Sequence, residues 1–223
     1  MPYGLEVYKD GVTEFLTTME SFVFFEKLTL TQYRQRISTG IPSNLTPPMI
    51  FIKTDTVLNG TDAVPTGMPR VLNENGFWVL YWDKLEQNAT PYHNLVFYLF
   101  VRMSEMPDAK LNKKWGCEIY QQGKLIQKSG ANPLRIRYAT GFNPGHDVMG
   151  KVIDVGVPCA VLMRVHSYYS IPAAGPLPAQ VFEVSACGSD HKILPQRSML
   201  SYGTTSNIIN DNNIEYIDTR MYD

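Results

Sequence analysis

Nine residues near the start of the chain read Tyr3-Gly4-Leu5-Glu6-Val7-Tyr8-Lys9-Asp10-Gly11. The first six alternate at a period of two, which is the period of a β-strand. The Asp-Gly step that closes the stretch provides the positive φ angles that a tight hairpin turn needs. The stretch therefore predicts a strand that ends in a tight turn.

The same pattern returns in the middle of the chain as Trp115-Gly116-Cys117-Glu118-Ile119-Tyr120-Gln121-Gln122-Gly123. Both copies contain, in order, an aromatic residue, glycine, glutamate, a β-branched residue, tyrosine and a closing glycine. A repeat at half the chain length favours paired subdomains. We expect an N-terminal β subdomain over residues 1–110 and a C-terminal one over 111–223, with one continuous domain as the alternative.

Short apolar segments separated by turn residues continue along the whole chain. No segment keeps a 3.6-residue apolar period over three turns, and residues 21–37 fit a strand better than a helix. Asn75-Gly76 predicts a hairpin between two such segments. The sequence predicts an all-β fold, a sandwich or barrel-like structure of two related halves with few or no helices. The predicted strands include Met49–Lys53, Phe77–Trp82, Leu95–Met103, Gly116–Tyr120, Lys124–Gln127, Leu134–Tyr138, Lys151–Val155, Cys159–Tyr169, Val181–Ala186 and Ile214–Asp218.

The composition is that of a globular protein without a strong charge. Of the 223 residues, 44% are hydrophobic and 18% are charged, and the net charge is −1. The low charged fraction argues against a disordered tail or a solvated coiled coil. The most basic stretch, Lys110–Arg137, is interpreted as a solvated face, so we expect no nucleic-acid partner.

The sequence gives no indication of a targeting segment or of a disulfide framework. The N-terminus has no basic region followed by an apolar one, and no apolar run approaches the ~20 residues that span a bilayer. Three cysteines, Cys117, Cys159 and Cys187, are too few and too scattered for a disulfide framework. We expect a protein that folds in a reducing cytoplasm and does not insert into membranes.

Residues that could perform chemistry are few, and their spacing is unfavourable. The four histidines do not have the spacing of a zinc site. Cys159 and His166 lie seven residues apart in one predicted strand near Asp154, and an odd separation places them on opposite faces. His146-Asp147 is interpreted as a polar turn. We therefore expect no enzyme, no metal and no cofactor.

The repeated motif also resembles a known group of proteins. Tyr3–Tyr8 followed by Asp10-Gly11 is similar to the opening of small tailed-bacteriophage proteins of unassigned role, encoded among virion and tail genes. Many of them continue with a second strand, a Ser-Gly step and an apolar-Arg-apolar strand. Here these would be Lys124-Leu125-Ile126, Ser129-Gly130 and Pro133–Ile136. The aspartate that usually precedes the serine is missing, because Gln127 and Lys128 stand there.

This resemblance implies a structural subunit of a bacteriophage virion, made in the cytoplasm of the host bacterium. We expect a minor tail or tail-tip protein that forms a homo-oligomer and contacts other virion proteins. The resemblance implies no catalytic residues. The equivalence of Glu6 and Glu118 in the two copies of the repeat favours a structural role for both. Aromatic residues at strand ends and in loops are the candidate interface anchors: Tyr168, Tyr169, Tyr202 and Tyr222.

Three alternatives stay open. A receptor- or carbohydrate-binding module of the tail could stack sugars on Trp78, Trp82 and Tyr92. A capsid decoration or head–tail connector protein would also be a virion component. An intracellular enzyme would need a pocket with convergent polar groups, which the sequence does not indicate.

Overall fold

The computed structural model describes eleven ranges of the chain. Within them the chain is built from β-strands and three short 3-10 helices, each of three residues. The expected all-β class is therefore confirmed. The described ranges are residues 6–9, 12–15, 21–31, 35–54, 69–81, 94–111, 118–121, 123–140, 152–171, 180–202 and 213–223.

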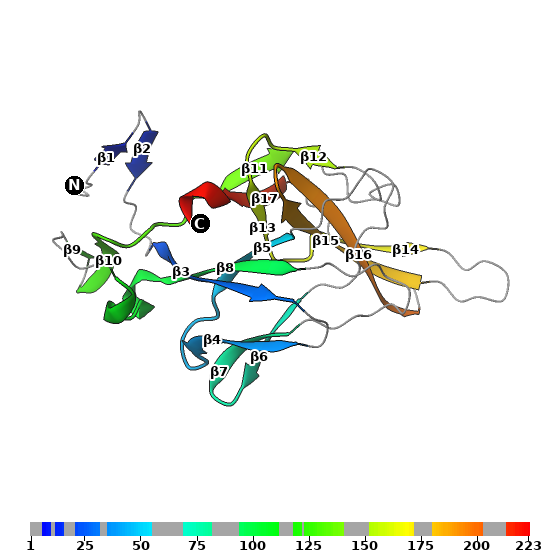
Figure 1. Ribbon diagram of the computed structural model, residues 1–223, viewed down its shortest axis with the longest axis horizontal. Coiled ribbons are helices and arrows are strands. Elements are labelled where there is room, and N and C mark those ends of the chain that lie inside the picture. Colours follow the sequence, from blue (N-terminus) through cyan, green and yellow to red (C-terminus); the bar gives the residue numbers. More distant parts are fainter. Residues whose placement is uncertain are drawn as a thin grey trace.

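The elements follow one another in the order shown in Figure 1. In the first half the strands are β1 (Glu6–Lys9), β2 (Val12–Phe15), β3 (Phe22–Leu30), β4 (Arg36–Pro42), β5 (Met49–Thr54), β6 (Arg70–Glu74), β7 (Phe77–Tyr81) and β8 (Leu95–Arg102). The helices η1 (Met103–Glu105) and η2 (Asp108–Lys110) follow. The second half contains β9 (Glu118–Gln121), β10 (Lys124–Lys128), β11 (Arg137–Thr140), β12 (Ile153–Asp154), β13 (Cys159–Leu162), β14 (Ser167–Ile171), β15 (Gln180–Ser189), β16 (Lys192–Tyr202), β17 (Asn213–Asp218) and η4 (Thr219–Met221).

Ten of these strands form one large sheet. Its main path is β11-β17-β13-β5-β15-β16-β12, to which β8, β3 and β14 are joined. The two ends of the path, β11 and β12, lie close together at the top of Figure 1, so the sheet is nearly closed into a barrel-like shape. A second, three-stranded sheet has the order β4-β7-β6.

The large sheet takes strands from both sides of the expected subdomain boundary. β3, β5 and β8 come from residues 1–110, and the other seven strands come from 111–223. β5 pairs with β8 from its own half and with β13 and β15 from the other. The boundary between residues 110 and 111 therefore does not separate two sheets.

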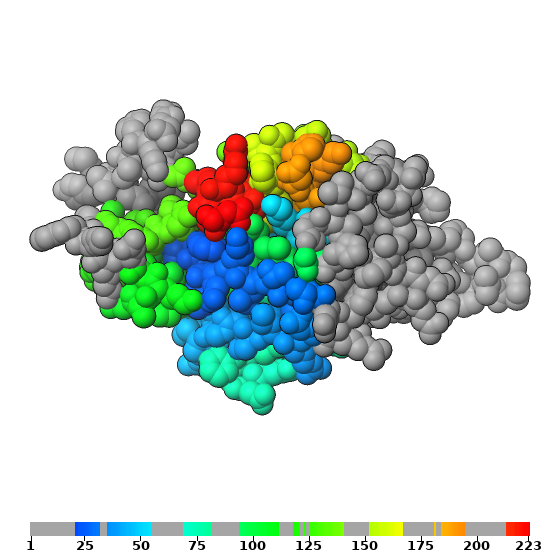
Figure 2. Space-filling view, in the orientation of Figure 1, coloured from blue at the N-terminus to red at the C-terminus, as the bar shows by residue number. Residues whose placement is uncertain are grey.

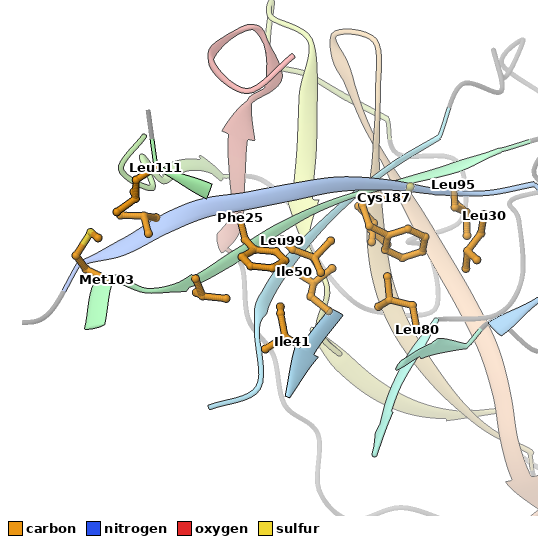
Figure 3. Close-up of a cluster of buried hydrophobic side chains, with 14 residues drawn as sticks. Phe25, Leu30, Ile41, Ile50, Leu80, Leu95, Leu99, Met103, Leu111 and Cys187 are labelled. Carbon is orange, nitrogen blue, oxygen red and sulfur yellow. The ribbon is translucent and has the colours of Figure 1, made fainter. Parts of the chain in front are cut away.

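The alternation of side chains on β5 and β8 places apolar groups on both faces of the sheet. Ile50 and Leu99 belong to a cluster that the three-stranded sheet covers with Ile41 and Leu80, as Figure 3 shows. Phe51 and Phe100 point to the opposite face and belong to a second cluster. Successive residues of a strand face opposite sides, so a strand covered on both sides must be apolar throughout. This explains the continuous apolar sequence of Leu95–Val101.

The second face is covered by the last residues of the chain, which we call the C-terminal strap (Asp218–Asp223). The ring of Tyr222 lies edge-on against Phe100, at 5.0 Å between centroids, and 5.4 Å from Phe24. Its hydroxyl donates to the Pro133 carbonyl at 2.9 Å and accepts from the Arg135 amide at 3.0 Å. Figure 2 shows the strap, in red, against the blue surface of β3.

Three ion pairs involve the two ends of the strap. The buried carboxylate of Asp218 accepts bonds from the Arg220 guanidinium at 2.9 and 2.6 Å, and Arg137 lies 3.4 Å away. Hydrogen bonds from Arg220 lower the pKa of Asp218, although burial opposes this. At the other end, Asp223 lies 2.9 Å from both Lys27 Nζ and the Tyr98 hydroxyl.

The β15–β16 hairpin crosses β13 at a very short distance at Gly188. A Cβ atom built on Gly188 would lie 2.1 Å from the carbonyl oxygen of Cys159 and 2.8 Å from the Cα of Ala160. Both are backbone atoms, which a side-chain rotation cannot move away. Glycine is therefore required for the two strands to approach.

We expect Gly188→Ala to lower the free energy of unfolding by about 3 kcal/mol or more, because the added methyl group meets backbone. The control is Gly76→Ala in the exposed β6–β7 turn, where φ is +80° and nothing lies within 4 Å of the new Cβ. Backbone strain alone should cost about 1–2 kcal/mol there. Urea unfolding followed by circular dichroism measures both. Equal losses would contradict the close crossing.

We expect Asp218→Asn to destabilise the protein at pH 7 and to have a smaller effect in acid. The folded pKa of Asp218 lies below its unfolded value of about 3.9, so its stabilisation is complete above that pH and is lost as the pH falls through the folded value. Urea midpoints at pH 7 and pH 3 should show the gap between the two proteins narrowing. A constant gap would mean that the Asp218 charge does not contribute.

Candidate interaction site at the repeated hairpins

Both copies of the sequence repeat form two-stranded antiparallel hairpins with a two-residue turn. In the first, Lys9 is opposite Val12, and in the second, Gln121 is opposite Lys124 at the equivalent positions. The second hairpin contains a register shift between Leu125 and Gln127, which the first does not. The repeat is thus present in the backbone as well as in the sequence.

The turn of the second hairpin depends on its glycine. Gly123 has a φ of +77°, in the left-handed region that favours glycine. The expectation of a strand followed by a glycine turn is confirmed for this copy. In the first copy, the equivalent turn residues lie outside the described part of the chain.

Each hairpin forms a sheet of its own, apart from the large one. Figure 1 places both at the same end of the molecule, on the left. The second is attached to the body through Ser21, whose hydroxyl donates to the Ile126 carbonyl at 2.6 Å and whose carbonyl accepts from the Met103 amide at 2.9 Å. Leu125 packs against the first apolar cluster. One side of this hairpin is therefore attached to the body.

The exposed side of the second hairpin presents a tyrosine and a small ionic network. Tyr120 is 58% exposed, and its hydroxyl donates to Glu118 at 2.7 Å. Lys128 forms ion pairs with Glu118 and, at 3.4 Å, with Asp108. Hydrogen bonds from Lys128 and Tyr120 lower the pKa of Glu118, and the bond to Glu118 raises the pKa of Tyr120. Glu118 is therefore an ionised surface partner of Lys128 at pH 7.

The Cys159, His166 and Asp154 combination does not form a reactive site. Cys159 is fully buried, and desolvation raises the pKa of its thiol to about 12, so it is protonated at neutral pH. His166 is also fully buried, and its backbone amide donates to the Val184 carbonyl at 2.8 Å. A nucleophilic cysteine needs a lowered pKa, which is the opposite of what burial gives here.

Asp154 has a different histidine partner from the one considered in the sequence. Its carboxylate lies 3.5 Å from Nε2 of His191, and Asp190 lies 2.8 Å from Nδ1 of the same ring. Asp154 lies on β12 and His191 lies in the β15–β16 turn, so their contact joins these two elements. Asp190 contacts the other nitrogen of the same ring. Sequence patterns did not indicate the contact of Asp154 with His191, although Asp190 and His191 are adjacent in a turn. His146 and Asp147 lie outside the described residues.

Among the described residues, no group of three or more histidine, cysteine or acidic side chains is placed to hold a metal ion. In the same ranges, no helix has the length and apolarity that crossing a membrane requires.

The candidate interface tyrosines lie in two separate places. Tyr168 and Tyr169 are on β14, and Tyr202 ends β16, so all three belong to the ribbon formed with β15. Their side chains lie outside the described part of the structure. Tyr222 is 6% exposed and packs in the second apolar cluster, so the structure places it in the core of its own chain.

Two of the three candidate sugar-stacking residues, Trp82 and Tyr92, lie outside the described ranges. Trp78 is half-buried, packs against the first apolar cluster, and donates from its indole nitrogen to the Leu45 carbonyl at 3.2 Å. The ring of Trp78 therefore packs against the body of the protein. Comparison with known proteins found no matching family model, no matching curated protein and no matching solved structure.

We expect the Cys117→Ser protein to resist alkylation in its native state. Its remaining cysteines, Cys159 and Cys187, are both fully buried. Iodoacetamide at pH 8 should label neither over an hour and should label both in urea, as intact-mass spectrometry would show. The wild-type protein is the control. Rapid labelling of a native thiol would contradict the burial and raised pKa of Cys159.

Proposed function

We propose that this protein is a structural subunit of a bacteriophage virion, a minor tail or tail-tip protein that forms a homo-oligomer and contacts other tail proteins. The observation that best supports the proposal is the repeated hairpin. Its residues are those that resemble the phage proteins, and both copies stand outside the large sheet at one end of the molecule.

Hairpins of this kind are suited to joining subunits. An edge strand presents unpaired backbone N–H and C=O groups, and a neighbouring chain can add a strand to it. Among the described strands, β1 pairs only with β2, and β9 pairs only with β10. The exposed ring of Tyr120 adds an aromatic contact of the type enriched at protein interfaces.

The described side chains do not favour a catalytic role. Cys159, considered as a nucleophile, is buried and protonated, and His166 is buried too. Glu118 is paired with Lys128 at the surface, where it supports the second hairpin. These observations favour a role in assembly over one in catalysis.

The test is the position of the protein in purified particles. An epitope tag inserted in the exposed Asn75-Gly76 turn lies away from both hairpins in Figure 1. Immunogold electron microscopy of particles that encode the tagged chain should place the label on the tail or its tip. The untagged phage is the control.

The other outcomes separate the alternatives. Label on the capsid or at its junction with the tail would favour a decoration or connector protein. Label at the tail tip, together with specific binding to a glycan array, would favour the receptor-binding module. Absence of the protein from washed particles would overturn the whole proposal.

A further inference from the structure

The two outer strands of the three-stranded sheet have edges of different kinds. Its order is β4-β7-β6, so β4 and β6 each pair with β7 alone among the described strands. On β4 the register shifts between Ser38 and Pro42, and a bulge and a proline protect an edge from pairing with another chain. All five residues of β6 pair with β7 in an unbroken register, and none of them is proline. β6 therefore presents a regular edge to which a strand can add.

The backbone of β6 provides two residues for this pairing. A two-residue turn is closed by a hydrogen-bonded pair, which here is Glu74 with Phe77. Hydrogen-bonded and non-hydrogen-bonded pairs alternate along an antiparallel ladder. Val71 and Asn73 are therefore in non-hydrogen-bonded pairs with β7, and their N–H and C=O groups point to the outer edge.

The charges of β6 are arranged symmetrically about its central residue. Arg70 and Glu74 are its two ends, and Leu72 is its centre. All three lie on one face of the sheet, because alternate residues of a strand face the same side. When two copies of β6 pair antiparallel about a two-fold axis through Leu72, each Arg70 comes opposite Glu74 of the other copy. Opposite charges at such positions stabilise the pair, so the partner that β6 fits is a second β6.

Both charged ends of β6 are accessible to a partner. Arg70 is exposed, and the Glu74 side chain is 27% exposed. Arg36 bonds to Oε1 of Glu74, so Oε2 can accept a bond from Arg70 of a second copy. Phe77, which is opposite Glu74 on the same face, is 42% exposed and would be partly covered by that arginine. Figure 2 shows the β6–β7 hairpin, in teal, at the surface of the lower end of the molecule.

We propose that β6 of one copy of this chain pairs antiparallel with β6 of a second copy, with Leu72 opposite Leu72 and Arg70 opposite Glu74. In this register Val71 bonds to Asn73 of the other copy, which uses the backbone groups that point outward. A two-fold axis makes the contact from a single surface, and the two three-stranded sheets become one sheet across the dimer. The inference rests on the proposed function, of which it names the self-association surface.

A cysteine cross-link tests the register in the Cys117→Ser background, in which the remaining cysteines are buried. A non-hydrogen-bonded antiparallel pair places two Cα atoms about 4.5 Å apart, which is within the range of a disulfide. Leu72→Cys should therefore form a linked dimer of the 25.3 kDa chain under mild oxidation. Ser38→Cys is the matched control, because Ser38 and Leu72 both pair with Val79 and Ser38 lies on the opposite edge. It should stay unlinked.

Sedimentation at concentrations up to about 1 mM measures the dimer without a cross-link. Arg70→Glu and Glu74→Arg each place like charges opposite one another, and each should weaken the dimer about tenfold or more. An equimolar mixture of the two variants should restore it, because every glutamate then meets an arginine. Arg102→Glu, at the end of β8, makes the same change of charge elsewhere and should have no effect. Unfolding midpoints show that each variant folds, including Glu74→Arg, which loses its ion pair with Arg36.

Three results would overturn the pairing. They are a wild-type chain that stays monomeric over the whole range, a dimer that neither charge variant weakens, and Leu72→Cys that links no faster than Ser38→Cys. A mixture that is no tighter than either variant alone would also reject the register.

The virion role is tested separately by mass spectrometry of washed, untagged particles, because a tag in the Asn75-Gly76 turn lies beside β6. The protein in particles together with a monomeric purified chain would reject the edge pairing alone. A linked dimer together with absence of the protein from particles would reject the virion role alone.

Discussion

The six residues of β5 determine how the rest of the sheet is arranged. Along one edge, β5 pairs with β8 over its whole length, from Met49 opposite Phe100 to Thr54 opposite Leu95. The other edge is shared, because Ile52 pairs with β13 and Lys53 with β15. A strand with partners on both edges and apolar clusters on both faces cannot move without disturbing all of them. This strand therefore joins strands of the first half of the chain to strands of the second half.

Several local sequence patterns predicted local structure. The predicted strand Cys159–Tyr169 is an exception, because the structure divides it into β13 and β14 with four residues between them. The Asn75-Gly76 pair predicted the β6–β7 turn, and both residues have the positive φ angles that such a turn needs, 53° and 80°. Leu95–Met103 was expected to be a buried strand, and β8 occupies Leu95–Arg102 with seven apolar side chains in a row. The closing glycine of the second repeat was likewise expected in a turn. In each case a property of a few adjacent residues is enough.

The contacts that define the sheet could not be predicted in this way. A period of two indicates which face a side chain occupies, but it does not indicate which distant strand pairs with it. The pairing of Ile52 with Val161 joins residues more than a hundred positions apart. The burial of Tyr222 could not be predicted for the same reason, since a tyrosine in a polar segment gives no local indication of its contacts with Phe24 and Phe100. Of the candidate site, the hairpins were predictable and their placement at one end was not.

The C-terminal strap has a consequence for how the protein is made. Lys27 and Asp223 are 196 residues apart in the chain, and the ribosome releases the strap only after every strand that it covers. Until then, the aromatic face of β3 and β8 is open to solvent and to other nascent chains. Contacts of such long range form slowly, and exposed apolar strands favour aggregation in the meantime. A chain that stopped before Tyr222 would leave that face uncovered and would be a target for chaperones and proteases.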